Sequence, residues 1–202
     1  MVTLYHNPYS QHCRRVVALM EEAGIDYDLV HVALDKGEHF GDAFTAINPN
    51  HQVPALIDGD VTLFESNAIL RYLCAKHGLA EWYPDDPATR ASIDQWLDWN
   101  QSRLSPRVID VVLNKVFMGD QGDKAAIARG EKALPELGAI LNAGLKGHDF
   151  LAGDRPTIAD LSVASNVTQL GFAEAVPDEP QLGPWYDRVS ALPGFQKSMP
   201  RG

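Results

Sequence analysis

Strand-like segments are confined to the first 64 residues of this chain, and every later periodic segment has helical spacing. Residues 2–5 and 26–33 read as strands on either side of a helix that begins near Ser10. The Asp58-Gly59 step between two apolar runs predicts a β-hairpin, and a helix is expected over 66–76. The order β-α-β followed by β-β-α predicts an α/β domain with a mixed sheet.

The second part of the chain is expected to be entirely helical. Residues 80–88 contain two prolines and two aspartates, which are typical of a linker. Helices are predicted over about 89–118, over about 124–143, from Thr157 onward, and over about 182–192, and Pro106 should kink or break the first of them. The predicted organisation is an α/β domain over 1–79, a linker over 80–88 and an all-helical domain over 89–202.

Charge and cysteine content exclude several classes of partner. The 202 residues carry a formal net charge of −10, which argues against nucleic acids and anionic membranes as main partners. No apolar run approaches the roughly 18–20 residues of a membrane-spanning helix, and the first residues lack the pattern of a signal peptide. The two cysteines, Cys13 and Cys74, form neither a disulfide framework nor a zinc spacing. We therefore expect a cytoplasmic protein without a bound metal.

Ser10 stands where a proline-containing loop meets an amphipathic helix. A serine there is commonly an N-cap, which accepts a hydrogen bond from a free backbone N–H. The same position can stabilise a thiolate, because a helix N-terminus offers donors and positive potential. Cys13 lies one turn inside the helix and is expected to be buried packing. Of Arg14 and Arg15, one is expected to be a buried ion-pair partner and the other a solvated charge.

Two further segments can be read as either structural or binding residues. Pro54 belongs at a sheet edge or in a cis bond, although cis is rare among X–Pro bonds. Ser66 is a predicted N-cap, and a helix start with Ser66 and Glu65 also suits the carboxylate and ammonium of one amino acid. Thr157 and Asp160 form a capping-box pattern, expected to be structural.

Four motifs, in this order along the chain, together resemble the cytosolic glutathione transferase family. They are Tyr9-Ser10-Gln11-His12-Cys13-Arg14, Asn48-Pro49-Asn50-His51-Gln52-Val53-Pro54-Ala55-Leu56, the run from Phe64-Glu65-Ser66-Asn67 to Leu73, and Gly153-Asp154-Arg155-Pro156-Thr157-Ile158-Ala159-Asp160. The first is similar to the serine-type motif of the theta and delta classes. The resemblance implies a thioredoxin-like N-terminal domain followed by an all-helical domain.

The resemblance also implies a set of glutathione-binding residues. Ser10 would be the catalytic residue and hydrogen-bond the glutathione sulfur, and Val53, before a cis Pro54, would pair with the cysteinyl backbone. Glu65 and Ser66 would take the γ-glutamyl ammonium and carboxylate. The set is completed by His39, His51, Gln52 and Asn67. His39 and His51 would lie near the glycyl end, and Asn67 departs from the arginine that family members often carry.

The activity implied is attack of a glutathione thiolate on a small hydrophobic electrophile, with glutathione as co-substrate and detoxification as the family's usual role. Residues expected to line the electrophile site are Leu104, Ser105, Val108 and Phe117. A homodimer is also implied. Two alternatives remain open: a glutathione-dependent peroxidase or disulfide reductase, and a non-catalytic interaction protein of the same fold. A cysteine-type mechanism is disfavoured, because Ser10 occupies the position that it needs.

Overall fold

The computed structural model describes residues 1–200, which divide into two compact units. The first unit combines Met1–Ala80 with the chain from Leu192 onward, and the second is Glu81–Ala191. The second unit is therefore an insertion into the first along the chain. This differs from the predicted division, in which the whole chain after residue 88 was helical domain.

A four-stranded mixed sheet forms the centre of the first unit. Its strands are β1 (Val2–His6), β2 (Tyr27–His31), β3 (Ala55–Asp58) and β4 (Val61–Phe64), in the order β2-β1-β3-β4. β1 pairs parallel to β2 and antiparallel to β3, and β4 pairs antiparallel to β3. The predicted β-α-β and β-β-α order and the Asp58-Gly59 hairpin are confirmed.

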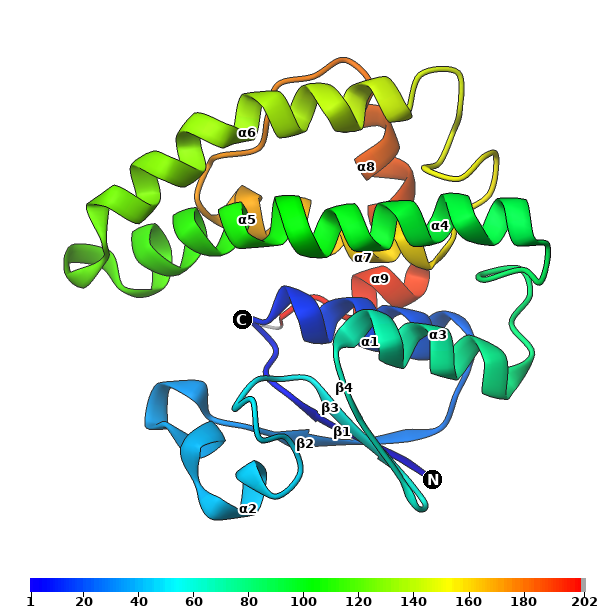
Figure 1. The fold of residues 1–202 in the computed structure, drawn as a ribbon, viewed down its shortest axis with the longest axis vertical. Coiled ribbons are helices and arrows are strands. Elements are labelled where there is room, and N and C mark those ends of the chain that lie inside the picture. The colour runs from blue at the N-terminus through cyan, green and yellow to red at the C-terminus, as the bar shows by residue number, and fades with distance from the viewer. Residues whose placement is uncertain (201–202) are drawn as a thin grey trace. The chain divides into compact units, whose positions relative to one another are not determined.

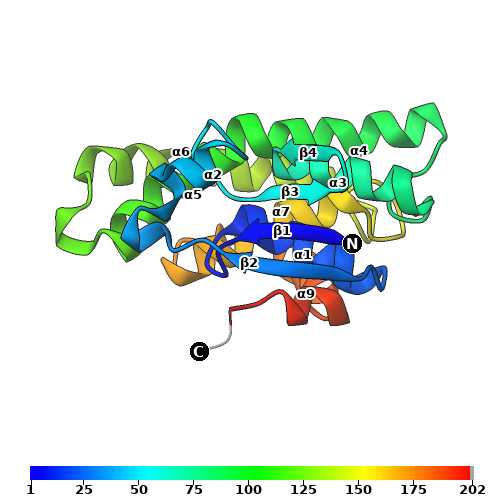
Figure 2. The same ribbon diagram turned by 90° about the horizontal axis from the view of Figure 1, so that it is seen from below.

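Three helices cover one face of this sheet, as Figures 1 and 2 show. They are α1 (Gln11–Glu22), α3 (Ser66–His77) and α9 (Pro193–Lys197), and the short α2 (Asp42–Thr45) lies in the connection before β3. α9 packs against α1 so closely that a Cβ on Gly194 would lie 2.6 Å from the Ala18 carbonyl oxygen. The Gly194 N–H donates to the Glu22 carboxylate. This contact explains why the last described residues belong to the first unit.

The regular secondary structure of the second unit is helical, apart from an isolated bridge between Phe150 and Gly153. Its helices are α4 (Pro87–Trp99), α5 (Ser105–Val112), α6 (Lys124–Gly144), α7 (Ile158–Phe172) and α8 (Leu182–Ser190). Near Pro106 the α-helical pattern changes to a π-helical segment, Asn100–Leu104, between α4 and α5. The flanking backbone stays in the helical region, so the chain changes its helix type there and does not leave the helix. A second π-helical segment, Leu113–Phe117, follows α5. Asn100 is fully buried and exchanges hydrogen bonds with Ser162 and Asn166 of α7, which fixes the first π-helical segment.

α7 is the core helix of the second unit, because every residue from Ile158 to Leu170 is buried. Thr157 caps it, and the predicted capping box with Asp160 is confirmed. Three of the residues expected to line an electrophile site, Leu104, Ser105 and Val108, are also buried in this unit. That expectation is wrong for these three, because their helix turns them inward, whereas Phe117 is half exposed.

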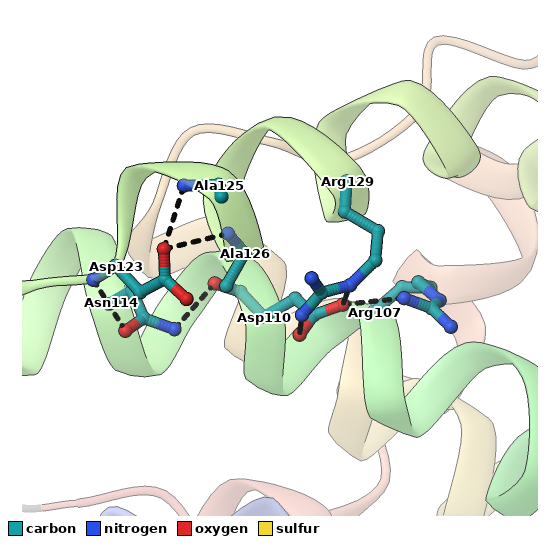
Figure 3. A network of polar contacts seen from close by, with 7 residues as sticks. All are labelled: Arg107, Asp110, Asn114, Asp123, Ala125, Ala126 and Arg129. Atoms are coloured by element: carbon teal, nitrogen blue, oxygen red, sulfur yellow. Dashed lines mark hydrogen bonds and ion pairs between the residues drawn. The ribbon is translucent and has the colours of Figure 1, made fainter.

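A polar network joins α5 to α6 (Figure 3). The Asp110 carboxylate accepts hydrogen bonds from Arg107 on its own helix and from Arg129 on α6, with the shortest distance to Arg129 at 2.6 Å. Asp123 caps α6 by accepting from the Ala125 and Ala126 N–H groups. The network fixes the two helices where the chain reverses. Across residues 1–200, no helix is long and apolar enough to cross a bilayer.

Candidate glutathione site

The strand register brings three of the predicted motifs to one end of the sheet. Ala55 of β3 lies opposite Tyr5 of β1 and opposite Phe64 of β4. The loop that leads to Ser10 leaves β1 after His6, one residue beyond Tyr5. Val53-Pro54 immediately precedes Ala55, and Glu65 immediately follows Phe64. Because adjacent strands lie only about 5 Å apart, the three segments are neighbours at this edge.

Ser10 caps α1 while its hydroxyl proton stays available for donation. Its backbone is extended, and its Oγ accepts the Cys13 N–H at 3.4 Å. A hydroxyl that accepts a hydrogen bond can still donate its own proton, so capping a helix and binding a thiolate are compatible. The N-cap prediction for Ser10 is confirmed.

Asn7 holds the loop before Ser10, a role that the sequence reading missed. Its side-chain amide donates to the Val32 carbonyl at 3.1 Å and accepts from the Tyr9 N–H at 3.1 Å. The backbone carbonyl of Asn7 accepts the Ser10 N–H at 3.1 Å. An Asn directly before a proline is a known turn-forming signal, and here it could have indicated this anchor.

Cys13 is a core residue and not a nucleophile. It packs with Val32, Phe44, Val53 and Ala55 and is 1% exposed. Burial raises the pKa of its thiol to about 11, although hydrogen bonds from Asn7 and Ser10 favour the thiolate. The prediction that Cys13 is buried packing is confirmed.

The adjacent arginines differ from the prediction, because both Arg14 and Arg15 are buried. α1 lies between the sheet and neighbouring helices, so its buried face is wider than the helical spacing of apolar residues indicated. Arg15 is completely inaccessible and donates through Nη1 to the Asn67 Oδ1 at 3.3 Å.

The Val53–Pro54 peptide bond is cis, as the resemblance implied. Both residues are buried, and the strand pairing begins only at Ala55, so the Val53 backbone lies outside the ladder. Asn48 organises the preceding turn by donating to the Gln52 carbonyl at 2.7 Å and accepting from the Asn50 N–H at 3.0 Å. The sequence reading did not single out Asn48.

The Glu65-Ser66 step combines an exposed carboxylate with an open helix N-terminus. α3 begins at Ser66, so Glu65 and not Ser66 occupies the N-cap position, which corrects the prediction. Glu65 has φ 68°, a conformation that is strained for a non-glycine residue and costs about 1–3 kcal/mol. Ser66 and Asn67 are buried in the first turn, where backbone N–H groups and the helix dipole attract an anion.

His39 and His51 lie together, although they are separated by a loop in sequence. The His51 Nδ1 is 2.9 Å from the His39 carbonyl oxygen, so Nδ1 carries the proton and donates. Phe40 contacts both rings, with centroid distances of 4.0 Å to His39 and 5.3 Å to His51. Gln52, the next residue, is exposed. Within residues 1–200, no three His, Cys, Asp or Glu side chains gather where they could hold a metal ion.

Comparison with known proteins identifies the family. Residues 1–75 match the family model described as "Glutathione S-transferase, N-terminal domain", and residues 124–192 match "Glutathione S-transferase, C-terminal domain". Glutathione S-transferase theta-1 of Mus musculus is 34% identical over 202 residues, covering 96% of this chain and 84% of the relative. The chain belongs to the glutathione S-transferase family. Glutathione S-transferase F10 of Arabidopsis thaliana is 32% identical, with 98% of this chain and 96% of that relative covered.

Solved glutathione S-transferase structures share both units. The theta-class enzyme from the citrus canker pathogen Xanthomonas axonopodis pv. citri, solved with glutathione bound, superposes with a TM-score of 0.92 at 32% identity. The match covers 100% of this chain and 98% of that structure. The thioredoxin-like sheet unit and the helical unit are thus those of a glutathione S-transferase, and the resemblance in the sequence is confirmed.

Proposed function

We propose that this glutathione S-transferase binds glutathione at the end of the sheet where β1, β3 and β4 meet, and that Ser10 activates its thiol for attack on a small hydrophobic electrophile. The observation that carries this proposal is the register at Ala55. It brings the segments of Ser10, Val53 and Glu65 to one edge of the sheet. The first segment offers a hydroxyl for the glutathione sulfur, the second a free backbone for the cysteinyl residue, and the third a carboxylate for the γ-glutamyl ammonium.

The assigned roles follow from the chemistry of each segment. The Ser10 hydroxyl donates to the glutathione sulfur and so lowers the thiol pKa, which raises the thiolate fraction near neutral pH. The Val53 backbone pairs with the cysteinyl residue. Glu65 binds the γ-glutamyl ammonium, while Ser66 and the start of α3 bind its carboxylate.

The remaining assigned contacts lie toward the glycyl end. His39 and His51 are assigned to the glycyl carboxylate, and Gln52 extends the same loop. The His51 Nδ1–H orients its ring by donating to the His39 backbone carbonyl. Asn67 supplies an amide beside Ser66. Glutathione is the co-substrate, and the proposal requires no metal.

The electrophile requires an apolar surface. Half-exposed apolar side chains lie on one face of α5 and the segment after it: Ile109, Leu113, Val116 and Phe117. Their spacing of four, three and one residues is that of a single helix face. We assign this face to the hydrophobic electrophile, in place of the buried Leu104, Ser105 and Val108.

Substitution of Ser10 tests the proposal. Ser10→Ala should lower kcat with an aryl halide by about 10- to 100-fold, the value of a lost hydrogen bond to a charged group, and leave glutathione affinity nearly unchanged. Ser10→Thr, which keeps the hydroxyl and the cap, should retain most of the activity. Equal turnover of Ser10→Ala and the parent enzyme would refute the role of Ser10.

The alternatives are separated by a panel of reactions. Aryl halide conjugation, alkyl halide conjugation, hydroperoxide reduction and disulfide reduction are measured on the same preparation. Reduction without conjugation would favour the peroxidase or reductase alternative. Failure to bind immobilised glutathione would favour a non-catalytic interaction protein.

The proposal also includes a cytoplasmic homodimer, as the family resemblance implies. Sedimentation equilibrium at several protein concentrations measures the mass of the particle. A monomer across the range would contradict the homodimer without affecting the proposed chemistry. Cell fractionation tests the location.

A further inference from the structure

A fully buried guanidinium lies behind the first turn of α3. Arg15 has no accessible surface, and its Nε donates to the Gln11 carbonyl at 3.3 Å while its Nη1 donates to the Asn67 Oδ1 at 3.3 Å. Arginine is almost never buried without a partner, because removing the charge from water costs several kcal/mol. Burial and the neighbouring Arg14 lower its pKa to about 9, and Glu65 acts in the opposite direction, so Arg15 remains a cation at neutral pH.

Asn67 connects this cation to the proposed γ-glutamyl subsite. It is the second residue of α3, directly after Ser66, and it is 7% exposed. Because its Oδ1 accepts from Arg15, the orientation of its amide is fixed and its NH2 end is a donor. An arginine at position 67 would carry a charge that attracts the γ-glutamyl carboxylate directly. This chain has a neutral amide there, and the buried charge that contacts it lies on α1.

We propose that Arg15 is a positioning residue for the γ-glutamyl carboxylate of glutathione, acting through Asn67 and supplying from α1 the positive charge that an arginine at position 67 would supply from α3. This inference rests on the proposed function, since it concerns the same ligand. It explains why a charge is retained in the interior of the sheet unit, where an apolar side chain of similar length would be less costly to bury.

Two ligands separate this role from a general structural role. Glutathione carries the γ-glutamyl carboxylate, and 4-aminobutyryl-cysteinyl-glycine is the same tripeptide without it. Calorimetric titration gives the affinity for each. The parent enzyme should prefer glutathione. In Arg15→Met and in Asn67→Ala, glutathione affinity should fall about tenfold, while the affinity for the analogue should stay within about twofold.

Glu65→Gln is the matched control, because both ligands retain the ammonium group. It should weaken both ligands by a similar factor and leave their ratio unchanged. The double variant Arg15→Met/Asn67→Arg should restore the preference for glutathione, because it moves the charge to α3. If Arg15→Met does not fold, Arg15→Gln, which removes the charge but keeps a side-chain donor, takes its place in the same comparison.

The outcomes distinguish the inference from the function on which it rests. If the parent enzyme binds neither ligand, the proposed function fails. If the parent prefers glutathione and both single variants keep that preference, only the role of Arg15 is overturned. A uniform loss for both ligands would also overturn it, since that is the effect of a merely structural residue.

Discussion

Asp160 should be among the most destabilising positions to truncate in the helical unit. Its carboxylate is fully buried, and its two oxygens accept four hydrogen bonds. Oδ1 accepts from the Leu151 N–H and the Trp185 Nε1, both at 2.9 Å. Oδ2 accepts from the Thr157 N–H at 2.8 Å and from its hydroxyl at 3.0 Å. Asp160→Ala would therefore leave buried donors from three different segments without an acceptor.

The magnitude follows from those donors. Each orphaned buried donor costs about 1–3 kcal/mol, and Leu151 and Trp185 are both buried. Burial raises the pKa of Asp160, so removing the carboxylate also relieves a desolvation cost, which offsets part of the loss. We expect Asp160→Ala to lower the free energy of unfolding by about 3 kcal/mol. The isosteric Asp160→Asn, which loses one acceptor oxygen, should cost about 1–2 kcal/mol.

Urea denaturation at neutral pH, followed by circular dichroism, measures these differences. Asp154→Ala is the matched control, because Asp154 lies in the same loop but is exposed, and it should change stability by no more than about 0.5 kcal/mol. The reasoning is refuted if Asp160→Ala unfolds at the same urea concentration as Asp154→Ala with an unchanged slope.

Three further outcomes are expected. Glu65→Ala should raise the KM for glutathione with little change in kcat, because it removes the ammonium contact; unchanged steady-state kinetics would contradict that contact. Lys76 holds the pKa of Asp58 below its usual value, so the stabilisation by Asp58 is present above about pH 4 and is lost as pH falls through the folded pKa. Urea titrations should show a stability gap between the parent and Asp58→Asn that narrows in acid, and a constant gap would exclude this linkage. Gly194→Ala should lower the melting temperature because its Cβ would overlap the backbone of α1, whereas Gly183→Ala, with open space around it, should not; equal melting temperatures would show that α9 is not held tightly.

Local patterns predicted individual elements of both units well. The hairpin at Asp58-Gly59, the cap at Ser10 and the box at Thr157 each depend on neighbouring residues, which the sequence displays directly. Pro106 likewise indicated an irregularity in its helix, although the structure has a π-helical segment there and not a break. The cis Val53–Pro54 bond was different, because propensity argued against it and only the family resemblance implied it.

What the sequence could not show depends on contacts between distant segments. Helical spacing could not reveal that Arg15 is enclosed, because its partner Asn67 lies on another helix. It also could not reveal that Leu104 and Val108 face inward, since their burial is set by the core helix α7. For Asn7 and Asn48, the turn chemistry was visible, but the segments that they anchor were not.

The docking of α9 has a consequence for the order in which the protein can fold during synthesis. Residues 1–80 leave the ribosome first, yet the helix that covers part of α1 is made only after the entire helical unit. Until then, the surface of α1 that receives Gly194 is uncovered, and the nascent sheet unit exposes it to other chains. Final closure of the first unit therefore waits for the last helix, so its folding is completed after translation of the second.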